Sequence, residues 1–404
     1  MGPGVSARSL SDAGQFGMTL INYLTRVHFA DGVLEEALRS EMERHGKRRP
    51  LVIAEEGHLT GTMSERFFAS FPIRSRIEVF TAIPNRITES AARDISKTYT
   101  DLDCDVLIAF GSNRAMDLAK TARIAIAHNE PISALSSEEG GGQRISETLP
   151  DLYTIPGILG FASAITDYTR VAPDEGGQVL LSSPRLLPRL TICDPTLTLG
   201  ASQSDSAIAA AGIFARAVDG YLAPGFNPPA EGLALDALSR AITYATDVLK
   251  QDRLPARRQM MASGLNSSLA LQKGLCPVHA ISNAVSSIAD KPIDPSTLGG
   301  ILIPVLMRHY EPFVAARAQP LRRSLSLGKH ESLADRIDRF LAMLPLCRSL
   351  EDLGLTLEDL PQAAQIASAD RAIGNGPVQM DADDVLDILM SAYRQPELAN
   401  ASTA

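Results

Sequence analysis

The chain has few cysteines, and they lack the spacing that zinc sites and disulfide frameworks use. Its four cysteines are scattered, with no CxxC pair among them. This favours reduced thiols over a disulfide-bonded secreted domain. No apolar run reaches membrane-spanning length, and the N-terminus lacks the basic-then-apolar pattern of a signal peptide. We therefore expect a cytoplasmic protein with no membrane partner.

An excess of positive charge is lacking as well. The formal net charge is −9, which argues against nucleic acid or an acidic membrane surface as a partner. Hydrophobic residues make up 45% of the chain and charged residues 21%, which is ordinary for a globular protein. A chain of 404 residues is too long for one compact core, so we expect two domains.

The pattern of apolar residues divides the chain into three parts. Residues 1–20 are rich in Gly and Ser and predict a flexible N-terminus. Over residues 21–195, short apolar strands alternate with helices, which predicts a parallel sheet with crossover helices. Over residues 196–404, apolar residues recur at spacings of three and four, which predicts a helical domain. We expect the active-site cleft between these two domains.

One stretch, DVLIAFGSNRAMDLAK, combines a strand, a turn and a helix. Val106 to Phe110 predict a buried strand, Gly111-Ser112 a turn, and the following residues a helix with Asp117 and Lys120 on one face. A glycine turn of this kind points backbone N–H groups at the space above it, which suits a phosphate. Lys120 is a second candidate for contacting a phosphate, although lysines near the start of a helix are usually just solvated.

Segments along almost the whole chain match one enzyme family in order and spacing. TRVHFADGVLEE matches an opening strand and helix, and GSNRAMDLAK matches a GGSxxDxAK turn. SSPRLLPRLTICDPTLTL matches SPxLxPxxxIxDPxLTL, and the tail from LEDLGLTLEDLPQAAQIA to NGPVQMDADDVLDILMSAY matches the closing helices. On these segments the chain resembles the iron-containing (group III) alcohol dehydrogenase family, which includes maleylacetate reductases and, more remotely, glycerol dehydrogenases.

The resemblance implies a fold and a cofactor. It implies an α/β dinucleotide-binding N-terminal domain and an all-α C-terminal domain, the dehydroquinate synthase-like architecture of iron-type alcohol dehydrogenases. It also implies a homodimer and NAD or NADP as the cofactor. An acidic residue near the ribose, here Glu55, favours NAD because it repels a 2′-phosphate. The positions that match the family's cofactor site are Glu55, Asn85, Gly111, Ser112, Asp117, Ser163 and Gln178.

Some family motifs are altered. In our alignment the family's GGGS falls on Ala109 to Ser112, so two glycines that allow close approach to a pyrophosphate are absent. The nicotinamide-side motif PTTAGTGSE becomes PGILGFASA, with its Thr pair and its Glu replaced.

The residues implied to hold the family's metal are mostly replaced. The family uses one Asp and three His, but the Asp position falls on Gly212 and the first His position on Arg216. These two positions are four apart on a helix, so both face the same way. His279 keeps a ligand place, with Asn283 where a second histidine is usual in the same helix, and the last ligand place falls on Pro295. One imidazole holds Fe²⁺ or Zn²⁺ too weakly, so we predict no bound metal.

Arg216 and His279 are the candidate catalytic residues. Arg216 lies in an apolar, Ala-rich helix, where its guanidinium could polarise a carbonyl or clamp a carboxylate in place of the ion. The alternative is a structural arginine paired with Asp219 or another acid. His279 is a candidate acid or base, and the alternative is a core histidine whose hydrogen bonds are satisfied.

Three functions compete. The first is NAD(P)-dependent reduction of an aldehyde, ketone or oxo-acid without a metal, with a small-molecule carbonyl or carboxylate as substrate. The second is a repurposed non-redox enzyme, a lyase, cyclase or isomerase that acts on an anionic metabolite. The third is a catalytically silent subunit whose cleft is filled by apolar side chains, for which the candidates are Phe110, Ile158, Phe161 and Phe214. The first is our prediction.

Overall fold

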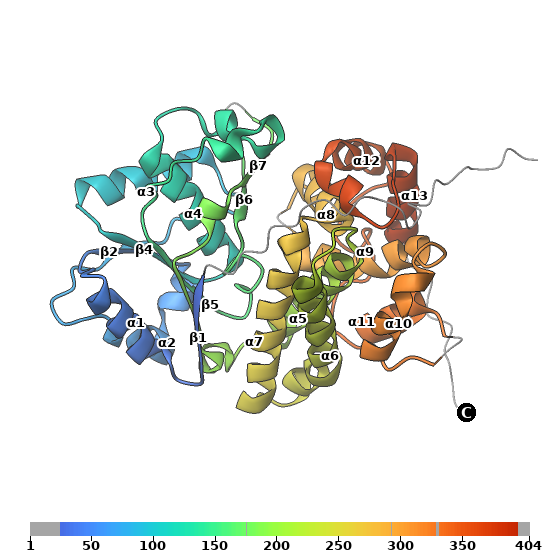
Figure 1. The fold of residues 1–404 in the computed structure, drawn as a ribbon, viewed down its shortest axis with the longest axis horizontal. Coiled ribbons are helices and arrows are strands. Elements are labelled where there is room, and N and C mark those ends of the chain that lie inside the picture. Colours follow the sequence, from blue (N-terminus) through green and yellow to red (C-terminus); the bar gives the residue numbers. More distant parts are fainter. Residues whose placement is uncertain (1–24, 175, 292, 329–330, 395–404) are drawn as a thin grey trace, which may run out of the picture.

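The computed structural model describes residues 25–174, 176–291, 293–328 and 331–394, without the side chain of residue 139. The predicted flexible segment, residues 1–20, lies outside this range. An α/β part built from the first half of the chain lies beside a helical part built from the second half (Figure 1). The described helices include no candidate for a membrane-spanning segment.

The α/β part is built on one parallel sheet of six strands. Their order is β1-β8-β5-β4-β2-β3, and every pairing between neighbours is parallel. The strands are β1 Arg26–Phe29, β2 Pro50–Ile53, β3 Glu78–Phe80, β4 Val106–Gly111, β5 Leu152–Pro156 and β8 Leu190–Cys193. An antiparallel hairpin, β6 Tyr168–Val171 and β7 Val179–Ser182, stands apart from the sheet.

Helices cover both faces of the sheet. They are α1 Leu34–Arg44, α2 Gly61–Ala69, α3 Glu89–Asp101 and α4 Asn113–Ala127. Successive side chains of a strand point to opposite faces, and β4 shows this directly. Ile108 and Phe110 share a core with α1 and α2, whereas Leu107 and Ala109 share a core with α3 and α4. Burial on both faces explains why β4 reads as a continuous apolar run.

The second half of the chain forms helices around α5. The helices are α5 Gln203–Leu222, α6 Pro228–Lys250, α7 Leu254–Leu269, α8 Pro277–Ile288, α9 Pro295–Tyr310, α10 Ala315–Ser324, α11 Leu333–Leu341, α12 Leu360–Ala369 and α13 Ala382–Tyr393. Small residues let α5 and α9 approach closely. A Cβ added at Gly299 would lie 2.9 Å from the Cβ of Ala215, and one at Gly300 would lie 3.0 Å from the Cβ of Ala211. The fold class expected from the resemblance is thus confirmed.

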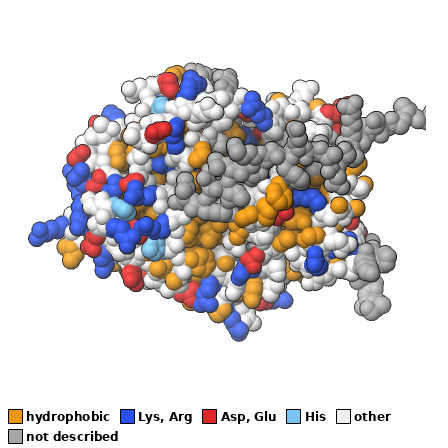
Figure 2. Space-filling view, viewed as in Figure 1, with side chains coloured by type: hydrophobic (Ala, Val, Ile, Leu, Met, Phe, Trp, Pro, Cys, Tyr) orange, Lys and Arg blue, Asp and Glu red, His pale blue; other side chains and the backbone are white. Residues whose placement is uncertain are grey.

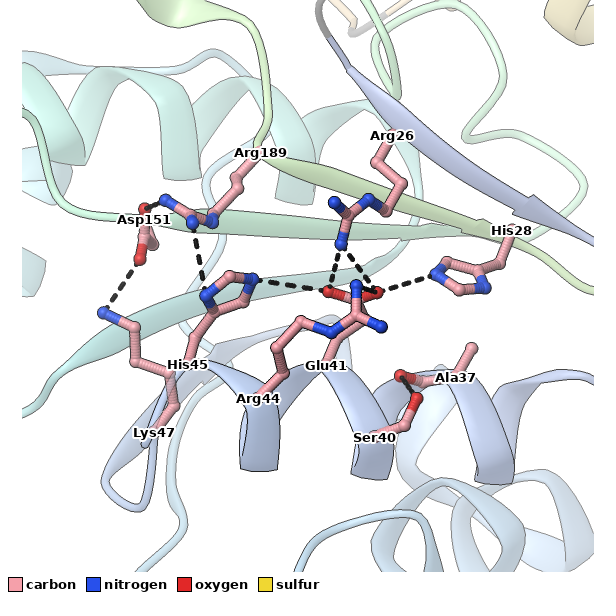
Figure 3. Close-up of polar contacts among 10 residues, drawn as sticks. All are labelled: Arg26, His28, Ala37, Ser40, Glu41, Arg44, His45, Lys47, Asp151 and Arg189. Atoms are coloured by element: carbon pink, nitrogen blue, oxygen red, sulfur yellow. Dashed lines mark hydrogen bonds and ion pairs between the residues drawn. The ribbon is translucent and has the colours of Figure 1, made fainter.

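Helix α1 is tied to the sheet by a buried carboxylate. Glu41, whose side chain is 4% exposed, accepts hydrogen bonds from Arg26 at 2.9 Å and from His28 at 3.1 Å (Figure 3). Arg44 lies 3.5 Å and His45 3.4 Å from the same carboxylate. Figure 2 shows Lys, Arg and His side chains gathered on the surface over α1 and β1. We call Glu41, together with Arg26, His28, Arg44 and His45, the Glu41 cluster.

Candidate functional site

A cavity of about 670 Å³ lies where the carboxyl ends of the parallel strands face the helical part. Its lining comes from the β4–α4 turn, the β6–β7 hairpin and helices α5, α8 and α9. Ligands of open α/β sheets bind outside the carboxyl ends of the strands, so this is the expected place for a site. Of the residues predicted from the sequence, Asn85, Ser112, Asp117, Ser163, Gln178, Arg216 and His279 line it.

Arg216 brings a buried positive charge to the cavity. The residue is 7% exposed, and its Nε is buried without a hydrogen-bond partner. Within the described ranges no acid forms an ion pair with it, and Asp219 instead accepts a hydrogen bond from the Val278 N–H at 2.8 Å. Burial lowers the pKa of Arg216 to about 10, so the guanidinium stays protonated at neutral pH. A buried cation without an ion-pair partner is costly, and Asp294, which lines the same cavity, offsets part of that cost by raising the pKa of Arg216.

The guanidinium occupies space that a side chain at Gly212 would need. A Cβ added at Gly212 would lie 3.1 Å from Nη1 of Arg216 and 2.4 Å from both Cβ and Oγ of Ser296. Ser296 stands in the first turn of α9, close to α5. An aspartate at position 212 would therefore need Ser296 to move.

His279 faces the same cavity from the first turn of α8. Its Nδ1 is buried without a hydrogen-bond partner among the described residues. Burial, together with the positive charges of Arg216 and Arg170, lowers its pKa to about 3. The imidazole is therefore neutral at physiological pH. This differs from the predicted acid or base with a pKa near neutrality, because the ring is buried beside two arginines and forms no ion pair with an acid among the described residues.

The side chains at the family's metal positions do not fit a divalent ion. Gly212 offers no donor atom, Arg216 is a cation without a lone pair to give, and Pro295 presents ring carbons. His279 alone has a suitable nitrogen, and one imidazole is too few for Fe²⁺ or Zn²⁺. Among the residues that the structure describes, no group of three His, Cys, Asp or Glu side chains could hold a metal.

The β4–α4 turn forms the other end of the cavity. Gly111 adopts a φ of +103°, which favours glycine, and Ser112 caps α4 by accepting a hydrogen bond from the Ala115 N–H at 3.3 Å. The hydroxyl of Ser112 also donates to Glu55 at the end of β2. Glu55 and Gly111 therefore stand behind the lining, where they support Ser112.

Two predicted residues present buried polar atoms to the cavity. Asp117 Oδ1 and Gln178 Oε1 have no hydrogen-bond partner among the described residues. Burial raises the pKa of Asp117, although Lys120, with its Nζ 3.6 Å away, opposes that effect. Lys120 is fully buried and donates to Thr166 Oγ1 at 2.7 Å. It is thus committed to the protein interior rather than to a phosphate.

The structure also brings residues to the site that sequence reasoning missed. Arg114 and Asn113 stand in the first turn of α4, and Tyr168 and Arg170 on β6. Arg114 lies three residues before Asp117, and this helical spacing was a usable signal. No pattern in the sequence pointed to Arg170, which pairs with Asp370 at 2.7 Å across 200 residues.

Comparisons with known proteins agree with this architecture. Residues 25–195 match the family model described as iron-containing alcohol dehydrogenase, and residues 207–393 match the C-terminal model of the same family. The chain is 30% identical over 376 residues to 4-hydroxybutyrate dehydrogenase of Cupriavidus necator, covering 91% of this chain and 98% of that protein. It is 24% identical to maleylacetate reductase 1 of Cupriavidus pinatubonensis, covering 93% and 97%.

Solved structures share the fold. The crystal structure of 1,3-propanediol oxidoreductase has a TM-score of 0.83 at 19% identity and covers 93% of this chain and 100% of that chain. Sulfoacetaldehyde reductase from Bifidobacterium kashiwanohense in complex with NAD⁺ has a TM-score of 0.83 at 18% identity, covering 94% and 100%.

Proposed function

Because this chain belongs to the iron-containing alcohol dehydrogenase family and is an alcohol dehydrogenase-like oxidoreductase, we propose that it interconverts a hydroxy acid and the corresponding oxo acid. In this proposal NAD is the redox cofactor and no divalent metal takes part. The observation that carries the proposal is the guanidinium of Arg216, which is buried at the cavity and forms no ion pair with any described acid.

The charge of Arg216 suits the reacting oxygen. When a carbonyl is reduced, negative charge develops on its oxygen, and a fixed cation beside it lowers the barrier. A divalent ion would act in the same way as a Lewis acid. Arg216 offers several N–H donors in a rigid fork and keeps its proton at neutral pH. We assign it the role of stabilising this oxygen.

The substrate class follows from the same unpaired charge. An uncharged aldehyde brings no negative charge to the buried guanidinium of Arg216, whereas a substrate carboxylate elsewhere in the same cavity would attract it while the carbonyl oxygen keeps the direct contact. Arg170 also lines the cavity and lowers the pKa of His279, although its own charge is paired with Asp370 at 2.7 Å. Two relatives act on carboxylates according to their names, 4-hydroxybutyrate dehydrogenase and maleylacetate reductase. These observations support an anionic substrate.

His279 is assigned to hydrogen bonding rather than to proton storage in the free enzyme. A neutral imidazole donates one N–H and accepts at its other nitrogen. A bound anion would offset the charges of Arg216 and Arg170 and raise the pKa of His279. The proton that reaches the product oxygen would then have a route through this ring.

The described residues fit a dinucleotide at the other end of the cavity. Asn85, Ser112, Asp117, Ser163 and Gln178 line it, with Glu55 and Gly111 behind them. Asp117 Oδ1 and Gln178 Oε1, which accept no hydrogen bond from the described residues, offer acceptors for the N–H and O–H groups of such a ligand. NAD, when bound, supplies or accepts the hydride.

The alternative of a catalytically silent subunit depended on apolar side chains that fill the cleft. The cavity is about 670 Å³, and the four apolar side chains suggested as a plug are not part of its lining. Phe110 stacks on Phe67 at 4.4 Å and Phe214 on Phe340 at 4.8 Å, in the cores of the two parts. The cavity is thus large enough for ligands of substrate and cofactor size. We find no observation that favours the non-redox alternative.

The test measures NADH oxidation with 4-oxobutanoate and, as a neutral control, with butanal. The protein is first dialysed against a chelator. We expect NADH-dependent reduction of the acid, with kcat/KM at least about tenfold above that of butanal, the ratio that one charge-assisted hydrogen bond would supply. Absence of NADH binding, or equal reduction of both aldehydes, would contradict the proposal.

A further inference from the structure

The surface on which a dinucleotide phosphate would rest is covered in this chain. The imidazole of His58 lies on Gly111, so closely that a Cβ added at Gly111 would be 2.7 Å from three of its ring atoms. Its Nε2 would be 3.5 Å from a Cβ added at Gly157, at the end of β5. The ring therefore spans the two glycines whose backbone would otherwise approach a phosphate.

Two of the backbone donors at the start of α4 are also occupied. The N–H of Asn113 donates to the Leu159 carbonyl at 2.9 Å, and the N–H of Ala115 donates to Ser112 Oγ at 3.3 Å. The hydroxyl of Ser112 is used by Glu55. Phosphate binding at a helix start normally uses such free groups. Fewer backbone donors are therefore left for a phosphate at this turn, so donors from side chains would add to its binding.

The guanidinium of Arg114 supplies donors for a phosphate at this turn. It stands in the first turn of α4, lines the cavity, and its side chain is 44% exposed. Its Nη1 donates to Asn85 Oδ1 at 2.6 Å, which fixes the guanidinium beside the β4–α4 turn. Its Nη2 lies 3.5 Å from Glu55 Oε1, a carboxylate already engaged by Ser112. The remaining N–H groups are free to face a ligand in the cavity.

We propose that Arg114, positioned by Asn85, binds the pyrophosphate of the dinucleotide in place of the covered glycine backbone. This rests on the proposed function for the presence of that cofactor. A guanidinium binds phosphate oxygens bidentately and with charge assistance. Its place at the positive end of α4 adds to the attraction for an anion. The phosphate thus binds to side chains at this turn.

The test is a fluorescence titration of wild type and variants with NADH, ADP-ribose and adenosine. For Arg114→Ala we expect the Kd of NADH and of ADP-ribose to rise about 10- to 100-fold. The Kd of adenosine, which has no phosphate, should not change. Arg114→Lys should recover part of the loss, and Asn85→Ala should weaken NADH binding severalfold because the guanidinium is no longer held.

Controls separate this inference from the proposed function. Arg49→Ala removes an arginine of similar exposure at the opposite end of the sheet, where it pairs with Asp103, and should leave NADH binding unchanged. The salt dependence of NADH binding should become shallower in Arg114→Ala, since one phosphate contact is lost. His58→Ala should leave binding unchanged or tighten it, because it uncovers Gly111.

The outcomes are distinct. If wild type binds NADH and Arg114→Ala binds it equally well, the inference is overturned while the proposed function stands. If instead His58→Ala raises the Kd of NADH about 10- to 100-fold, His58 binds the phosphate and the inference is again wrong. If wild type binds no dinucleotide, the proposed function and the inference fail together.

Discussion

Two regions of this protein bury a charged side chain, and they differ in whether that charge has ion-pair partners. At the Glu41 cluster, a buried carboxylate is surrounded by two arginines and two histidines (Figure 3). At the cavity, the buried guanidinium of Arg216 has no acid in contact within the described residues. We interpret the paired charge as one that stabilises the fold, and in our proposal the charge without an ion-pair partner binds a ligand.

The positions of the two regions in the sheet agree with this difference. Arg26 begins β1 and the Glu41 cluster lies at the amino ends of the strands, together with Asp151 and Arg189. The cavity lies at their carboxyl ends. Parallel sheets place binding at the carboxyl ends and leave the opposite end to stability. Removing a charge should therefore change stability in one region and activity in the other.

The largest expected effect follows from Arg216→Met. We expect kcat for an oxo acid to fall about 100- to 1,000-fold, the loss that removal of an oxyanion-stabilising donor produces. The free energy of unfolding in urea should stay equal or rise, because an uncompensated buried charge is removed.

A matched control for this variant is Arg257→Met. Arg257 is also buried, but it pairs with Asp252 at 2.7 Å and donates to Ser206 at 2.7 Å. We expect this substitution to lower stability clearly. If both methionine variants lost stability alike, the contrast between paired and unpaired charges would be wrong.

The next largest expected effect is a loss of stability in Glu41→Gln. Glutamine keeps the shape of the side chain but replaces the carboxylate, which accepts hydrogen bonds from Arg26 and His28, with a neutral amide. We expect a loss of about 2 kcal/mol in the free energy of unfolding, measured in urea at pH 7. The kcat and KM should not change, because the cluster lies at the end of the sheet away from the cavity. A change in kcat without a change in stability would contradict this assignment.

Much of the fold could be predicted from the sequence, because local patterns determine it. The apolar run of β4, the turn at Gly111 and the helix after it are encoded within sixteen residues. Proline usually ends a helix, so sequence patterns give no sign that helix α9 begins at Pro295 and continues through Pro304. Helix α10, an arginine-rich segment with Pro320 inside it, was not predicted.

The site was harder to predict than the fold, because it depends on distant contacts. The sequence placed Arg216 and His279 through the family resemblance. It gave no sign that Ser296 would fill the space above Gly212 or that His58 would cover Gly111. These contacts join segments that lie more than fifty residues apart, so no local periodicity reports them.

The pH dependence of stability offers a finer test of the Glu41 cluster. Burial alone would raise the pKa of Glu41, but hydrogen bonds from His28 and Arg26 outweigh it and hold the pKa below the ordinary 4.5. A carboxyl with a depressed folded-state pKa stabilises the protein above its unfolded pKa and loses this contribution as the pH falls. The stability difference between wild type and Glu41→Gln should therefore shrink below about pH 4.5.

The smallest expected effect is in the pH profile of His279→Gln. The pKa of His279 is about 3 in the free protein, so the ring does not titrate between pH 5 and 8. We expect kcat/KM to fall about tenfold through the lost hydrogen bond, with the shape of its pH profile unchanged over that range. An acidic limb near pH 6.5 in wild type that disappears in the variant would assign His279 an ordinary pKa.

The central claim is that the Arg216 guanidinium takes the place of a divalent ion. The direct measurement is the rate of 4-oxobutanoate reduction by NADH in chelator-treated protein, with the metal content determined on the same sample. We predict full activity without stoichiometric iron or zinc, and no gain when either ion is added back. Loss of activity on chelation, with recovery on addition of Fe²⁺ or Zn²⁺, would contradict the account.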